Sequence, residues 1–136
     1  KHNPSRTGVH IHGYTPSLDQ VFSQQGCILL APLRFGAGIK GKIIDAWTYG
    51  VPVVTTPVGS EGLTLHTEGG TQSSFGGGVA WTIDEFVEMA VELAISSNFR
   101  HQAITCGQEI LRRSQDRSSN WGFFFLEAVD RRSIVE

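Results

Sequence analysis

The chain has 136 residues, of which 40% are apolar and 18% are charged. This length and composition fit one domain with a modest core, and they exclude a chain that is disordered over most of its length. A formal net charge of −2 argues against a general nucleic-acid-binding protein and against a membrane-surface binder. No run of about 18 apolar residues is present, so we expect no transmembrane segment in this chain.

The two cysteines, Cys27 and Cys106, lie too far apart in the sequence to form a metal-binding motif. The simplest interpretation is a protein that keeps its thiols reduced, and the expected location is therefore the cytoplasm. A disulfide between the two cysteines remains an alternative.

The chain begins with a pattern that is typical of a strand followed by a short helix. Residues 8–12 alternate apolar and polar side chains and run into a turn at residues 13–16, which predicts a strand. Ser17 then offers an N-cap, and apolar residues at helical spacing follow it.

Two continuous apolar runs dominate the next part of the sequence. Residues 27–31 and 51–55 have no polar alternation, which predicts strands that are buried on both faces of a parallel sheet. Between them, a glycine-rich loop at residues 34–41 leads into a predicted helix at residues 42–47.

The second half of the chain starts with a stretch that is rich in Gly, Ser and Thr. We expect residues 64–78 to form a long surface loop, because they contain few apolar side chains. Asp84 is expected to cap the helix that follows. The remaining predicted elements are a strand at residues 79–81 and helices at residues 85–96, 99–113 and 121–135, the last of them amphipathic.

Alternating strands and helices predict the α/β fold class, with a parallel sheet and crossover helices. Open parallel sheets bind their ligands at the carboxyl ends of the strands. The loop 34–41 follows a buried strand and precedes a helix, so it is expected to lie where a ligand would bind.

This loop contains residue types that suit a phosphate group. Gly36 and Gly38 lack side chains, so the backbone can turn tightly and approach a ligand closely. The helix that follows presents unpaired N–H groups and the positive end of its dipole. Arg34, Lys40 and Lys42 place three cations around this point in a chain of net negative charge. The combination predicts a site for a diphosphate.

One alternative is the phosphate loop of nucleotide hydrolases. Residues 36–42 match its pattern of Gly, four residues and Gly-Lys. The next residue in that motif is Ser or Thr, whose hydroxyl binds magnesium, whereas this chain has Ile43. Without that hydroxyl, an ordinary phosphate-loop nucleotide hydrolase is disfavoured.

A wider match is carried by three segments. They read LAPLRFGAGIKGKIIDA at residues 30–46, YGVPVVTTP at residues 49–57 and GSEGL at residues 59–63. Together they resemble the C-terminal, donor-binding domain of group 1 glycosyltransferases with the GT-B fold. The resemblance implies a partial Rossmann-like parallel sheet, and residues 1–136 are then expected to form a single partial nucleotide-sugar-binding domain. It also implies an enzyme that transfers a sugar from a nucleotide-sugar to an acceptor, with retention at the anomeric centre.

The resemblance assigns the nucleotide-sugar to the loop and the helix after it. In this family two glutamates commonly flank the loop, and the second binds the ribose. Asp45 occupies that second position, whereas Leu33 and Arg34 stand where the first glutamate would be. Of the two lysines, we expect Lys42 to contribute more, because Lys40 lies further from the helix start. The predicted binding residues are Arg34, Phe35, Gly36, Ala37, Gly38, Lys40, Lys42 and Asp45.

No metal ligands and no cofactor are expected, because the resemblance implies that cations of the protein stabilise the leaving group. The expected partners are the nucleotide-sugar donor and an N-terminal acceptor-binding domain, and no nucleic acid. That acceptor-binding domain is missing from this sequence, so we expect the chain by itself not to catalyse transfer. The alternative is a non-catalytic nucleotide-sugar-binding domain, or a degenerate domain that is kept for its interactions.

Overall fold

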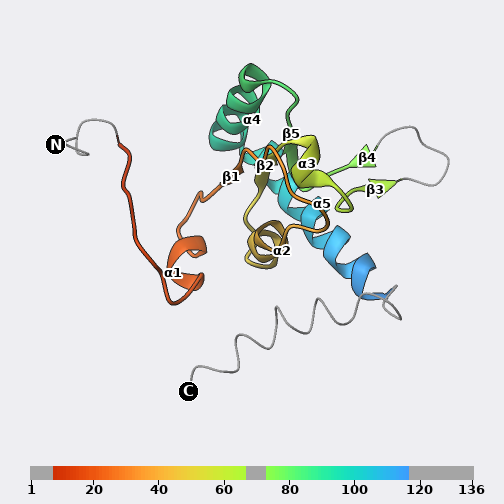
Figure 1. Ribbon diagram of the computed structural model, residues 1–136, viewed down its shortest axis with the longest axis horizontal. Coiled ribbons are helices and arrows are strands. Elements are labelled where there is room, and N and C mark those ends of the chain that lie inside the picture. Colours follow the sequence, from red (N-terminus) through yellow and green to blue (C-terminus); the bar gives the residue numbers. More distant parts are fainter. Residues whose placement is uncertain (1–7, 67–72, 117–136) are drawn as a thin grey trace.

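A computed structural model describes residues 8–66 and 73–116, and its centre is a three-stranded parallel sheet (Figure 1). The strands are β1 (Leu29–Ala31), β2 (Val53–Thr55) and β5 (Gly77–Val79), in the order β1-β2-β5. Leu29 pairs with Val53, and Val53 pairs with Gly77. The two apolar runs of the sequence are therefore parallel neighbours. The predicted α/β class with a parallel sheet and crossover helices is confirmed.

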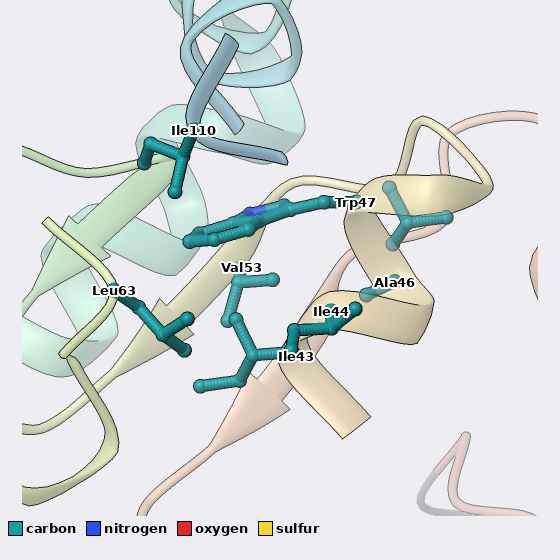
Figure 2. Close-up of a cluster of buried hydrophobic side chains, with 8 residues drawn as sticks. Ile43, Ile44, Ala46, Trp47, Val53, Leu63 and Ile110 are labelled. Carbon is teal, nitrogen blue, oxygen red and sulfur yellow. The ribbon is translucent and has the colours of Figure 1, made fainter. Parts of the chain in front are cut away.

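The helix between the first two strands, α2 (Gly41–Thr48), covers one face of the sheet. Its apolar residues are buried because they recur at helical spacing on the side that faces β2. The largest of them is Trp47, whose side chain is only 1% exposed. Figure 2 shows its indole ring between Val53 of β2 and Ile110 of α5 (Ser97–Asp116).

Two glycines, Gly76 and Gly107, bring backbone directly against this indole ring. Trp47 Nε1 donates a hydrogen bond of 2.9 Å to the carbonyl of Gly76, and the ring packs edge-on against Phe75. A Cβ atom at Gly76 would lie 2.5 Å from Trp47 Nε1, and one at Gly107 would lie 2.6 Å from Trp47 Cδ1. Both glycines are therefore required so that β5 and α5 can approach the ring. Some of the 16 glycines of the chain thus serve packing.

The other face of the sheet is covered by α4 (Ile83–Ile95). Val54 points to this face, because neighbouring residues of a strand point in opposite directions. It packs with Leu93 of α4 and Ala103 of α5 in a second buried cluster. The helix begins at Ile83 rather than Glu85, so the prediction that Asp84 is the N-cap was wrong.

Thr82 is the N-cap of α4 because it forms a reciprocal pair with Glu85. The Thr82 hydroxyl accepts from the Glu85 N–H at 3.2 Å, and the Glu85 carboxylate accepts from the N–H groups of Thr82 and Trp81. This capping box satisfies the orphan donors that Asp84 was expected to satisfy.

Replacing Thr82 by Ala is expected to destabilise the chain by about 1 kcal/mol, because the first turn of α4 loses its cap. The midpoint of urea unfolding measures the change. Thr105→Ala, at an exposed position within α5, is the matched control and is expected to cost nothing. Equal losses from both variants would contradict the role of the cap.

The N-terminal part of the described chain differs from the prediction. Residues 8–12 form no strand, and Ile11 is 92% exposed. An alternating strand needs a neighbouring strand to accept its hydrogen bonds, and none of the described strands lies beside this segment. The helix after it, α1 (Asp19–Phe22), has four residues and begins after Leu18 rather than Ser17.

The segment predicted to be a long loop contains strands. β3 (Leu65–His66) and β4 (Ser73–Ser74) pair antiparallel, and β5 already starts at Gly77. The low apolar content is misleading because β5 uses glycine for close packing. A Cβ atom at Gly77 would lie 1.8 Å from the carbonyl oxygen of Val53, and its φ is 142°. A residue of β5 can lie this close to the backbone of β2 only if it is glycine.

Two further helices differ from the prediction. A short helix, α3 (Pro57–Ser60), follows β2 and was not predicted. The helix expected at residues 99–113 is α5, which extends further at both ends. The predicted helix at residues 121–135 lies outside the described residues.

Candidate functional site

The glycine-rich loop joins the carboxyl end of β1 to the first turn of α2 (Figure 1). Because β1, β2 and β5 are parallel, the connections that leave all three strands start from the same edge of the sheet. Thr56, at the start of α3, and Thr82, at the start of α4, follow the other two strands at that edge. The loop therefore lies at the ligand-binding edge of an open α/β sheet.

Two glycines give this loop its conformation. Gly36 has a φ of 125° and Gly38 a φ of 74°, both in the region that favours glycine. A Cβ atom at Gly38 would meet nothing within 4 Å. The requirement for glycine there is conformational rather than steric. The resulting loop is exposed, so its backbone is accessible to a ligand.

Lys40 holds the loop together from the start of α2. It is the N-cap residue of that helix, and its ammonium group donates to the carbonyl of Gly36 at 3.2 Å and to the carbonyl of Gly38. An ammonium group has three N–H donors. Two of them fix the loop, and the third can bind a ligand oxygen. Lys40 is thus more closely integrated into the loop than the sequence indicated.

The other predicted binding residues lie on the same loop or further along α2. Phe35 is 86% exposed, and Arg34, Ala37 and Lys42 are exposed as well. Asp45 is half-buried in the second turn of α2, and the first turn of that helix contains no acidic residue. The structure therefore joins Gly36, Gly38 and Lys40 by direct contacts, with Lys42 on the following turn.

Two residues that the sequence did not single out fix the base of the loop. The Thr55 hydroxyl donates to the carbonyl of Ala31 at 2.8 Å, and the Thr56 hydroxyl donates to the carbonyl of Leu33 at 2.5 Å. These bonds tie the ends of β2 and β1 together just where the loop begins. The sequence signal that could have identified them is Thr-Thr-Pro after an apolar strand, because a threonine before a proline is a typical helix start.

The cysteines do not supply a reactive group. Both are free thiols, and burial raises the pKa of Cys27 and of Cys106. For Cys106 the nearby carboxylate of Glu109 raises the pKa further. A thiol with a raised pKa is protonated at neutral pH, so it is a poor nucleophile and a poor metal ligand. In residues 8–66 and 73–116, no three His, Cys, Asp or Glu side chains gather as a metal site would require.

A comparison with known protein families decides the family. Residues 1–94 match the family described as glycosyl transferases group 1. The chain belongs to this family. The matched range includes the glycine-rich loop, the sheet and nearly all of α4 of this group 1 glycosyltransferase domain. No curated protein and no solved structure matched the chain significantly. Across the part of the chain that the structure describes, no helix has the length and apolar character needed to cross a membrane.

Proposed function

We propose that this chain binds the nucleotide-sugar donor of a glycosyltransferase, with the diphosphate on residues 36–42. The observation that carries the proposal is the position of Lys40. Its ammonium group is held between the carbonyls of Gly36 and Gly38 at the N-terminus of α2. A cation, an exposed glycine backbone and a helix N-terminus meet there at the carboxyl edge of a parallel sheet.

The physical reason is the charge of the ligand. A nucleotide-sugar carries negative charge on its diphosphate, and the leaving nucleoside diphosphate becomes more negative as the sugar departs. Lys40 and Lys42 would offset this charge, together with the first N–H groups of α2. Arg34 is exposed at the start of the same loop and can reach a phosphate oxygen with a forked pair of donors. These cations would replace a metal ion at the leaving group.

Two other residues extend the proposed site beyond the diphosphate. Asp45 lies in the second turn of α2, where its carboxylate can accept a hydrogen bond from the ribose hydroxyls. Phe35 exposes its ring on the loop, where it can lie against the base or the sugar. Gly36, Ala37 and Gly38 provide the backbone between them.

We further propose that the isolated chain binds the donor without transferring it. The described residues form one parallel sheet with one ligand-binding edge, whereas transfer needs a second site for the acceptor. A non-catalytic nucleotide-sugar-binding domain is the second candidate. It is favoured by the same feature, the one ligand-binding edge of the parallel sheet in the described residues. A transfer assay with the enzyme's acceptor domain added separates the two, because only a glycosyltransferase domain gains activity.

Replacing Lys42 by Ala is expected to weaken the binding of a nucleoside diphosphate, because the variant loses a charged donor worth about 1.5–3 kcal/mol. That corresponds to about a ten- to hundred-fold higher dissociation constant. The binding of the nucleoside alone should not change, since the lost partner is phosphate. Titration calorimetry with UDP, GDP and ADP, and with the matching nucleosides, measures both.

The matched control is Arg113→Ala, which removes one exposed cation from the far end of α5. It is expected to leave diphosphate binding unchanged. If Arg113→Ala and Lys42→Ala weaken binding equally, the net charge of the chain matters rather than the loop. If neither diphosphate nor nucleoside binds to the unaltered chain, the proposed function is wrong.

A further inference from the structure

The outer side of α4 carries a row of exposed apolar side chains. Ile83, Val87, Val91 and Ile95 are spaced four residues apart, so they follow one another along one side of the helix. Their side chains are 83%, 55%, 50% and 78% exposed, respectively. We call these four residues the α4 stripe. It is separate from the buried side of the helix, where Leu93 packs against the sheet.

The α4 stripe is unusual for the exposed side of a helix, because all four of its side chains are large, apolar and β-branched. Single exposed apolar residues are normal on a protein surface, but a continuous row of them marks a contact site. The row runs along a helix of 13 residues, which is about 20 Å long. That length suits a second helix that packs along α4.

An acidic row accompanies the stripe. Asp84, Glu88 and Glu92 are also spaced four residues apart, each next to a stripe residue, and all three are exposed. α4 contains no Lys or Arg. The stripe is therefore bordered by negative charge that no basic residue of the same helix offsets.

The negative charge of this row argues against three of the possible binding partners of the α4 stripe. An anionic membrane surface would be repelled by the acidic row. A second copy of the chain that used the same stripe would bring a second acidic row and no basic residue from its own α4. The chain's own residues 117–136 contain three Arg and three Asp or Glu, so they carry no net positive charge to match the acidic row.

We propose that the α4 stripe binds an amphipathic helix of a partner protein, whose apolar face is bordered by Lys or Arg. Apolar residues of the partner helix cover Ile83, Val87, Val91 and Ile95, and its basic residues pair with Glu88 and Glu92. The apolar contacts contribute most of the affinity, and the charges determine which helix is accepted. The surface lies on α4, apart from the loop that holds the proposed diphosphate site.

The test uses two synthetic amphipathic helical peptides with the same leucine face, one bordered by Lys and the other by Glu. Fluorescence anisotropy with the full chain measures both dissociation constants. We expect the Lys peptide to bind at least about tenfold more tightly than the Glu peptide. The double variant Glu88→Lys and Glu92→Lys should reverse this preference, which loss of folding cannot imitate.

A second pair of variants tests the stripe itself. Val87→Glu should weaken the Lys peptide at least about tenfold. Val9→Glu changes a valine of similar exposure, 58%, outside α4 and should have no effect. The proposal is wrong if both peptides bind equally, if Val9→Glu and Val87→Glu act alike, or if neither peptide binds. It is also wrong if the stripe mediates self-association, or if peptide binding appears only after residues 117–136 are removed.

Discussion

Replacing Trp47 by Ala is expected to destabilise the fold by about 3–5 kcal/mol, the cost of removing a buried aromatic side chain. The indole ring fills the space between α2, β2, β5 and α5, and it contacts backbone on two sides (Figure 2). Gly76 and Gly107 have no side chains that could move into the cavity. For a domain of this size the loss represents a large part of the total stability. Thermal and urea unfolding, followed by circular dichroism, measure it.

Two variants separate the contributions to this effect. Trp47→Phe keeps most of the apolar contact but loses the indole donor to the Gly76 carbonyl, which still accepts from the Val53 N–H at 3.2 Å, so a smaller loss of about 0.5–1.5 kcal/mol is expected. Trp81→Ala removes a tryptophan that is 80% exposed and should change stability little. A similar loss from Trp47→Ala and Trp81→Ala would contradict the described core.

Replacing Lys40 by Ala is expected to weaken nucleoside diphosphate binding by about a hundred-fold or more, which is at least as much as Lys42→Ala and reverses the ranking expected from the sequence. Two effects combine. The ligand loses a charged donor, worth about tenfold to a hundred-fold, and the loop loses the two bonds that hold Gly36 and Gly38 in place. The loop would then have to be ordered when the ligand binds, which reduces affinity further. Titration calorimetry of both lysine variants measures the ranking.

Glycine variants test the loop conformation without changing a charge. Gly36→Ala places a side chain at a φ of 125°, so the loop must rearrange and diphosphate binding should fall. Gly13→Ala is the control outside the loop, because the φ of Gly13 is not positive and its Cβ atom would meet nothing within 4 Å. If Gly36→Ala binds as tightly as Gly13→Ala, the loop conformation is not needed for binding.

The parallel sheet could be predicted from the sequence because two of its strands are continuous apolar runs. Residues 27–31 and 51–55 flank a helix, and a crossover helix between buried strands implies parallel pairing. The place of the glycine-rich loop followed from the same argument. These features depend on local patterns of a few residues, and the structure agrees with them.

The parts that could not be predicted depend on contacts between distant residues. β5 begins with Gly77 and Gly78, two residues of low strand propensity. Glycine is needed at both positions because Val53 and Met89 lie too close to leave room for a Cβ atom. The side chain of Lys40 turns back toward Gly36 and Gly38, whereas the sequence showed only a cation next to glycines. Residues 8–12 have a strand pattern, but a strand also needs a neighbour.

The diphosphate of a nucleotide-sugar is proposed to bind at residues 36–42, and amide chemical shifts can follow this placement residue by residue. Nitrogen-15 spectra of the full chain are recorded with a nucleoside diphosphate and, separately, with the nucleoside alone. This placement predicts that the amides of Gly36, Gly38 and Gly41 shift with the diphosphate and not with the nucleoside. Shifts that gather instead around Thr82, at the start of α4, while the loop amides stay unchanged, would contradict it.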